Sequence, residues 1–306
     1  MAINTFEYAK LLQNKLDQHM IDTSATGWME ANAGQVIYKG GNEVKIPTMT
    51  TTGLKNYDRD SGYKQGAITT SYKTYTMTQD RGTVFHIDAM DVDETGFIVN
   101  AASVTKEFQD RHVIPEVDAY RLSKISAIAA AANQSKDYTV DEATILAELK
   151  AGIRAVQDYI GGTPVRIILT SEVLGALENS SKWDRTVQVD NFTQGNLNFQ
   201  VKSIDGNRIQ TVPSARMFSQ ILVKDGETEG QETGGYEKAV GAQDINFLIV
   251  AENAPIAISK TDLLRIFDPL TNQDANAWKI DYRKYHDLWI KASMEKAIYA
   301  NLKPGA

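Results

Sequence analysis

One long stretch, residues 40–126, limits what this chain can fold into more than any other part of the sequence. It begins with extended, Thr- and Tyr-rich segments on either side of a turn-rich tip, and it continues into an unusually long helical pattern. The predicted hairpin has no clean apolar face, and a two-stranded ribbon alone is at best marginally stable in water. We therefore expect the hairpin to lie on another surface, which favours a structural role over catalysis.

The hairpin itself is predicted from alternation and composition. Val44 and Ile46 alternate with charged neighbours, which is typical of a half-buried strand. Residues 53–63 combine turn formers with charge and predict the hairpin tip. The return segment, residues 68–79, is rich in threonine, which favours a pleated surface.

The period changes to helical over residues 96–133. Apolar stripes at three- and four-residue spacing predict a helix on the order of 55 Å long. Pro115 interrupts it and predicts a kink or a break costing roughly 3 kcal/mol. Three acidic residues, Asp91, Asp93 and Glu94, come just before the pattern and suit the positive end of a helix dipole. This long helix is expected to serve as the spine of a plate.

The remaining segments predict two further units. Residues 6–20 are predicted to form an amphipathic helix, either an ordinary surface helix or an arm that docks on a neighbouring chain. Residues 138–257 alternate strands and helices, with a helix end at residues 161–162 and a hairpin at residues 205–206, and predict a compact α/β domain. Residues 278–302 return to strands that we expect to form the floor under the long helix, so the outer domain is discontinuous.

Composition excludes several classes. The 306 residues carry a net charge of −7 and no dense Lys/Arg cluster, which disfavours direct nucleic-acid binding as the main role. The absence of cysteine excludes disulfides, thiolate metal sites and cysteine nucleophiles. We find neither a signal peptide nor an apolar run of the ~20 residues that a membrane span needs. The sequence therefore predicts a soluble protein, intracellular when made, with no membrane partner.

Candidate chemistry is weak throughout. The four histidines are scattered without metal-ligand spacing, and no nucleophile elbow, phosphate loop or dinucleotide fingerprint occurs. Residues 91–96 imitate the start of a calcium loop, but Ala102 stands where a bidentate glutamate is needed. A cross-link between Lys55 or Lys64 and an asparagine would need a carboxylate in a dry site, whereas surface lysines are the simpler interpretation. We predict no enzyme activity, no catalytic residue, no metal and no cofactor.

Two groups of residues are candidates for structural roles. The hairpin tip concentrates side chains that suit an anchor on a neighbouring subunit, since Tyr and Arg are favoured at interfaces, although a solvated loop is the alternative. These tip residues are Leu54, Tyr57, Asp58, Arg59, Asp60 and Tyr63. At the hairpin base, Arg81, Asp88 and Asp91 lie among apolar residues and are predicted to act structurally.

Several motifs occur in a fixed order along nearly the whole chain. They are Thr52-Gly53-Leu54 with Tyr57-Asp58-Arg59, residues 75–82 with 85 and 87–95, Phe108 with residues 113–121, residues 212–217, residues 265–269, residues 272–275, and Tyr282-Arg283 with Tyr285-His286-Asp287. In these motifs and their order the chain resembles the major capsid proteins of tailed bacteriophages with the Hong Kong 97-type fold.

The resemblance implies an α+β fold in four parts. These are an N-terminal arm (1–33), an extended loop (34–83), a peripheral domain with the spine helix (84–137 and 258–306) and an inserted axial domain (138–257). It implies pentamers and hexamers that form an icosahedral shell around double-stranded DNA, assembled in the host bacterial cytoplasm and located in the virion. Scaffolding and portal proteins are the implied partners. Some members carry a long N-terminal scaffolding domain that is later cleaved, whereas this chain opens with a short predicted helix. The resemblance then implies either a separate scaffolding protein or a processed chain, and Met1 favours the first.

Alternatives remain at this point. An encapsulin-like compartment shares the implied fold but houses a cargo enzyme, and an unrelated enzyme or sugar-binding β-protein has little support. The net charge of −7 predicts that a shell would hold DNA by enclosure, because few phosphate contacts mean little counterion release.

Overall fold

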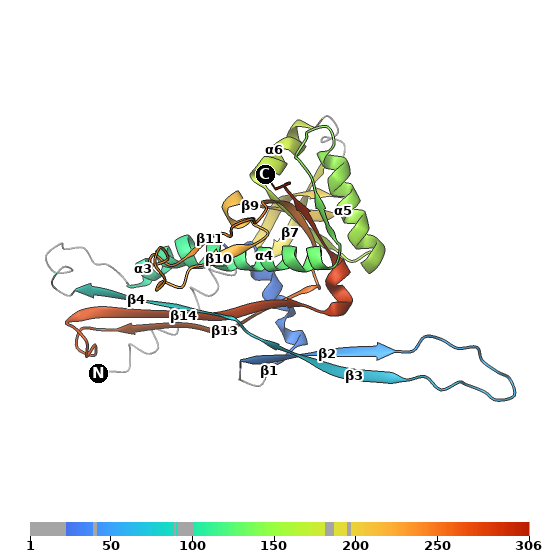
Figure 1. Ribbon diagram of the computed structural model, residues 1–306, viewed down its shortest axis with the longest axis horizontal. Helices are drawn as coiled ribbons and strands as arrows, with labels where there is room; N and C mark the ends of the chain where they lie inside the picture. Colours follow the sequence, from blue (N-terminus) through green and yellow to red (C-terminus); the bar gives the residue numbers. More distant parts are fainter. Residues whose placement is uncertain are drawn as a thin grey trace.

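The computed structural model describes residues 23–38, 42–88, 90, 101–180, 187–194 and 197–305. Within these residues the strands form sheets of two, three, three and seven strands. Figure 1 shows an upper body of helices and strands, a long flat sheet beneath it and a narrow hairpin that projects beyond both. The predicted α+β class is confirmed. The predicted helix at residues 6–20 lies outside the described residues.

The upper body is built on a seven-stranded sheet whose strand order is β5-β15-β12-β6-β9-β8-β7. The strands are β5 (Ser135–Asp137), β6 (Val165–Thr170), β7 (Val187–Gln194), β8 (Leu197–Ile204), β9 (Asn207–Val212), β12 (Ile245–Ala251) and β15 (Ile298–Leu302). Every residue of β12 is buried, as its unbroken apolar run predicts. Asp205 and Gly206 both have positive φ in the turn between β8 and β9, which confirms the predicted hairpin.

Two helices, α5 (Ile145–Ile160) and α6 (Ser171–Asn179), pack against this sheet. Gly152 lets α5 approach closely, because a Cβ there would lie 2.7 Å from Ile249 Cδ1 and 2.9 Å from Tyr299 Cδ1. Gly161 ends α5 with φ of 70°, as predicted. The body thus has one continuous apolar core between helices and sheet.

The long sheet consists of three antiparallel strands, β4 (Gln79–Asp88), β14 (Ala277–Ile290) and β13 (Pro255–Phe267). Residues alternate between half-buried and exposed along the whole of β4, so one of its sides packs and the other faces solvent. The packed side meets the spine helix in a second apolar cluster. Its buried members are Val113, Ile114, Val117, Leu264, Ile280 and Tyr282.

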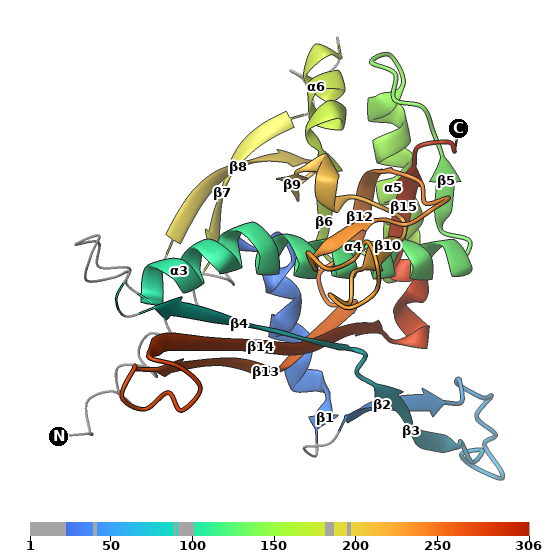
Figure 2. The ribbon, with the colours of Figure 1, turned by 60° about the vertical axis from the view of Figure 1, so that its left-hand side comes forward.

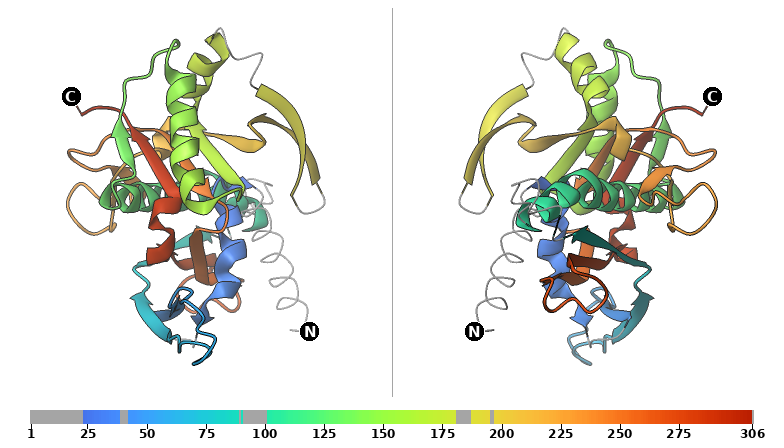
Figure 3. Two further views of the ribbon diagram at one scale, coloured as in Figure 1. Left: turned by 90° about the vertical axis from the view of Figure 1, so that its right-hand side faces the viewer. Right: turned by 90° about the vertical axis from the view of Figure 1, so that its left-hand side faces the viewer.

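The spine is formed by α3 (Ala101–Phe108), a π turn (Gln109–Val113) and α4 (Ile114–Ala131). Figures 2 and 3 show it running between the upper body and the long sheet. Pro115 was predicted to kink or break the helix. Instead it lies in the first turn of α4, directly after the wider π turn, in which the Ile114 N–H reaches back to Gln109 O. The helical path therefore continues through the proline, since a proline in a first turn removes no needed donor.

The projecting hairpin is formed by β2 (Glu43–Thr51) and β3 (Ile68–Thr76), with the short β1 (Ile37–Tyr38) beside its root. Only the root is buried, in a third apolar cluster with β13 and β14. Its buried members are Val44, Ile46, Met77, Ile256, Ile258, Tyr285 and Trp289. The hairpin ladder ends at Thr76, so residue 83, the predicted end of the extended loop, lies inside β4.

The last strand corrects one expectation. Residues 298–302 were predicted to join the floor under the spine, but β15 lies between β12 and β5 in the seven-stranded sheet. All five of its residues are buried, which suits an interior strand covered on both faces rather than one with a solvent side. A short 3₁₀ helix (Ala292–Ala297) carries the chain from β14 to β15.

Candidate assembly surface

The hairpin tip is an ordered turn of its own. Asp58 and Gly62 exchange two backbone hydrogen bonds, of 3.2 Å and 2.8 Å, and Gly62 has φ of 76°. The Asp60 N–H donates to Asp58 Oδ1 at 2.9 Å. This hydrogen bond, with others from Ser61, holds the pKa of Asp58 below its usual value. These hydrogen bonds, all within residues 58–62, give the tip a defined shape of its own.

The side chains of this tip are presented to solvent. Leu54 is fully exposed, and Tyr57 and Tyr63 are 60% and 92% exposed. The two tyrosine rings meet edge to face, with centroids 5.0 Å apart. Arg59 and Asp60 are exposed in the turn beside them. Aromatic rings with a polar end and a rigid geometry suit contact with another protein surface, so the structure gathers all six predicted tip residues at one exposed end.

The ribbon carries an apolar stripe that sequence reasoning missed. The register pairs Pro47 with Tyr72, Met49 with Thr70 and Thr51 with Ile68, which places these residues on one face. Met49, Ile68 and Tyr72 on that face are 66%, 73% and 56% exposed. Val44 and Ile46, which bury the root, belong to the opposite face. Only the strand register reveals the stripe, because its members are spread over two strands among threonines.

At the hairpin base, Arg81 contacts two other parts of the chain. Its Nε donates to Glu116 Oε1 of α4 at 2.8 Å, and its Nη1 and Nη2 donate to the carbonyls of Lys224 and Gly235 at 2.6 Å and 3.5 Å. The last two residues flank the paired strands β10 (Ile221–Val223) and β11 (Tyr236–Lys238). Arg81 thus joins β4, the spine helix and the β10–β11 loop.

The other predicted base residues are not part of this site. Asp88 is exposed at the far end of β4, about 24 Å from Arg81 at 3.4 Å per residue. Its carboxylate accepts a hydrogen bond from the Met90 N–H at 2.8 Å. Asp91 lies outside the described residues. The structure does not bring Arg81 and Asp88 together, because they lie seven positions apart along one extended strand. The structural role expected of Asp88 and Asp91 stays a prediction.

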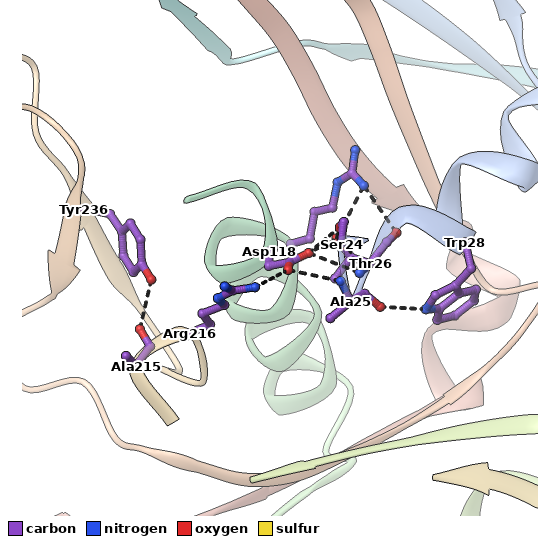
Figure 4. A network of polar contacts seen from close by, with 9 residues as sticks. Ser24, Ala25, Thr26, Trp28, Asp118, Ala215, Arg216 and Tyr236 are labelled. Atoms are coloured by element: carbon purple, nitrogen blue, oxygen red, sulfur yellow. Dashed lines mark hydrogen bonds and ion pairs between the residues drawn. The ribbon is translucent and has the colours of Figure 1, made fainter. Parts of the chain in front are cut away.

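The spine helix carries a buried carboxylate, Asp118, that sequence reasoning did not single out. It accepts hydrogen bonds from Ser24 Oγ and Thr26 Oγ1, both at 2.6 Å, and from the N–H groups of Ala25 and Thr26, both at 3.1 Å. Arg216, from the short 3₁₀ helix Ser214–Arg216, donates to it at 3.0 Å. Figure 4 shows these partners converging on Asp118 from two sides of α4.

One turn further along α4, the buried Arg121 repeats the pattern with opposite charge. It donates to Thr26 O at 3.3 Å and to Glu30 Oε1 at 2.5 Å. Burial alone would raise the pKa of Glu30, but Arg121 holds that pKa below its usual value. Glu30 lies in the 3₁₀ helix Gly27–Gln35. Asp118 and Arg121 are opposite charges three residues apart in an apolar helix segment, and this spacing could have predicted the buried polar contacts from the sequence.

An open cleft of about 720 Å³ is lined by Gly27, Trp28, Glu30, Ala31, Asn32, Arg166, Glu252 and Asn253. Its Arg166 is already paired with Glu252 at 2.7 Å and lies 4.5 Å from the Trp28 ring centroid. No group of three or more His, Cys, Asp or Glu among the described residues is placed to hold a metal ion. In the same residues, no helix is long and apolar enough to cross a membrane.

No protein-family profile and no curated protein matches the chain. Several solved structures do match the chain in fold. The mature capsid of bacteriophage PhiM1 aligns with a TM-score of 0.55 at 14% identity, over 87% of this chain and 83% of that one. The capsid of Cyanophage P-SCSP1u aligns with a TM-score of 0.54 at 10% identity, over 88% and 85%. This chain has the fold of phage capsid proteins.

The capsid fold is shared beyond phages. A virus-like particle from Pyrococcus furiosus aligns with a TM-score of 0.52 at 8% identity, over 97% of this chain and 100% of that one. The resemblance stated from the sequence motifs is thus confirmed at the level of the fold. The structures that share this fold are phage capsids and a virus-like particle.

Proposed function

We propose that this chain is the major capsid protein of a tailed double-stranded DNA bacteriophage, assembling as pentamers and hexamers into an icosahedral shell. The observation that carries the proposal is the hairpin, which buries its root and leaves an aromatic tip and an apolar stripe in solvent. A folded chain gains nothing from such a ribbon on its own. The capsid fold supplies the reason for it, since copies of one chain can cover each other's hairpins.

In this proposal the tip residues Leu54, Tyr57, Asp58, Arg59, Asp60 and Tyr63 contact a neighbouring subunit. The exposed face with Met49, Ile68 and Tyr72 extends that contact along the ribbon. The root of the opposite face, with Val44 and Ile46, is covered by the chain's own β13 and β14. A ribbon that is anchored at its root and exposed over the rest of its length suits contact with the surface of a second copy.

The proposed shell has further parts. In the proposed division, the arm, extended loop, peripheral and axial domains take the predicted ranges 1–33, 34–83, 84–137 with 258–306, and 138–257, with three changes: β5 and β15 go with the axial sheet, and the extended loop ends before β4. The protein would assemble in the host cytoplasm with scaffolding and portal proteins and reside in the virion. The genome would be held by enclosure, given the net charge of −7.

Electron microscopy with light scattering tests the proposal. The chain is purified alone and after co-expression with the scaffold candidate encoded beside it. Closed shells or ring-shaped capsomers are expected. A strict monomer under both conditions would overturn the proposal.

A second candidate is an encapsulin-like compartment with an enzyme inside. It is favoured by the alignment over all of the Pyrococcus furiosus virus-like particle chain. Mass spectrometry of shells purified from the native source separates the two functions. A single co-purifying enzyme with a docking tail indicates a compartment, whereas portal and tail proteins with packaged DNA indicate a phage head.

A further inference from the structure

The chain passes from the hairpin to the long sheet across the peptide bond between Met77 and Thr78. β3 ends at Thr76 and β4 begins at Gln79, so neither residue belongs to a strand. Figure 2 shows the chain bending between these strands. Any change in the direction of the hairpin relative to the long sheet has to be absorbed at this joint or in the root beside it.

Side chains of β14 hold this peptide group from both ends. Tyr285 Oη donates to Met77 O at 3.1 Å, and the Thr78 N–H donates to Asp287 Oδ2 at 3.1 Å. Thr78 Oγ1 also donates to Asp287 Oδ2 at 3.1 Å. Met77, Tyr285 and Asp287 are buried. Hydrogen bonds are directional, so two of them on opposite ends of one peptide plane fix its orientation.

The spine helix takes part in the same network. Tyr120 Oη donates to Asp287 Oδ1 at 2.8 Å, and Lys124 Nζ also donates to Asp287 Oδ1. Lys124 Nζ lies 5.7 Å from the Trp289 ring centroid, and that ring is 5.8 Å from the ring of Tyr75 in β3. A continuous set of contacts therefore runs from α4 through β14 to the hairpin.

We propose that Tyr285 and Asp287 lock the Met77–Thr78 joint and so set the direction in which the hairpin leaves the long sheet. Tyr120 and Lys124 couple that direction to the spine helix. The leverage is large. A nine-residue strand extends about 30 Å beyond the joint, so a rotation of about 10° displaces its end by about 5 Å. The consequence for subunit contacts rests on the proposed function, but the lock is a property of the single chain.

The chain lacks cysteine, which permits a clean distance measurement. Spin labels are placed at Ser71→Cys on β3 and Asp158→Cys on α5, both exposed positions. Double electron–electron resonance is recorded on protein diluted with unlabelled chains, so that distances within one chain dominate. The unaltered lock is expected to give one narrow distance distribution.

Three variants weaken the lock. Asp287→Asn leaves a single acceptor oxygen that cannot serve both Thr78 and Lys124. Tyr285→Phe removes only the hydroxyl on Met77 O, and Thr78→Val removes only Oγ1; these two keep the test open if the first variant fails to fold. Each is expected to broaden or shift the distribution, and hydrogen exchange at the Thr78 amide should become about tenfold faster in Asp287→Asn.

Asp80→Asn is the matched control. It breaks an exposed ion pair between β4 and β14 close to the joint, with Asp80 Oδ2 and Arg283 Nη2 2.5 Å apart, and should leave the distance distribution unchanged. The lock is refuted if Tyr285→Phe and Asp287→Asn lower stability while distances and exchange stay as in the parent. Failure of the parent to form shells would instead refute the proposed function, without bearing on the distances.

Discussion

Arg81 of β4 and Glu116 of α4 form a partly buried ion pair, with 2.8 Å between Arg81 Nε and Glu116 Oε1. The same guanidinium donates to Lys224 O and Gly235 O. One side chain thus fastens the strand that follows the hairpin to both the spine helix and the β10–β11 loop.

Truncating this side chain should be costly. Arg81→Ala leaves Glu116 without its partner and is expected to lower the free energy of unfolding by about 1–3 kcal/mol, measured by urea denaturation. Arg283→Ala, which removes an exposed pair on the same sheet, should stay within about 0.5 kcal/mol of the parent. Equal effects of the two changes would contradict a special role for Arg81.

The Asp118 network should matter more, because its carboxylate is fully buried. Asp118→Ala leaves Arg216 and four donors of residues 24–26 without their acceptor, and is expected to lower the free energy of unfolding by about 3–5 kcal/mol. The double variant Asp118→Ala with Arg216→Ala should cost less than the sum of the single changes, since the two groups interact directly. Strict additivity in denaturation would count against the pair. Asp244→Ala, at an exposed pair with Lys238, is the control.

His286 predicts a pH dependence of stability. Burial, followed by the nearby charges of Arg121, Lys284, Lys124 and Arg81, holds the pKa of His286 well below its usual value. Its Nδ1 has no hydrogen-bond partner among the described residues. The folded chain therefore keeps the imidazole neutral in a range where the unfolded chain protonates it.

The sign follows from this difference. The stability that the neutral His286 contributes to the fold is fully present above about pH 6.5. As the pH falls from there toward the depressed pKa of His286, the free energy of unfolding decreases by at most about 1.4 kcal/mol per pH unit. His286→Gln should flatten the dependence between pH 6.5 and 5, followed by denaturant titrations at each pH. His86→Gln, at an exposed position of β4, should keep the parent slope. A parent slope retained in His286→Gln would assign the effect to other groups.

Removing the hairpin tip separates folding from assembly. Replacing residues 53–63 with a short Gly-Ser turn should leave the unfolding free energy nearly unchanged, because the tip touches no core. Shell formation, followed by light scattering and microscopy, should be lost. Tyr57→Ala with Tyr63→Ala should weaken assembly in the same direction, whereas Thr69→Ala on the ribbon should not. Shells as stable as those of the parent would refute the predicted contact.

Duplex DNA should bind weakly. With a net charge of −7, isolated subunits should show little affinity at physiological salt, measured by fluorescence anisotropy over a salt series. Micromolar or tighter binding with a steep log–log salt slope would mean that a basic patch forms on one face.

Local sequence determined much of the architecture. The apolar run of β12, the glycine that ends α5 and the turn at Asp205 and Gly206 each appear where the sequence placed them. The tip and its exposed tyrosines were also predictable, since turn formers and the absence of an apolar face are properties of a few adjacent residues. These features depend on backbone preference and periodicity, which act over one or two turns of chain.

Tertiary structure decided what depends on distant partners. The strand β15 has an apolar sequence that would suit either sheet, and only packing between β12 and β5 assigns it to the upper one. Asp118 meets Ser24 and Arg216, which are 94 and 98 residues away, so no local pattern identifies the network. The apolar stripe and the held Met77–Thr78 peptide likewise exist only once strand register and crossing are set, because hydrogen bonds and side-chain contacts between segments follow from three-dimensional proximity rather than from spacing along the chain.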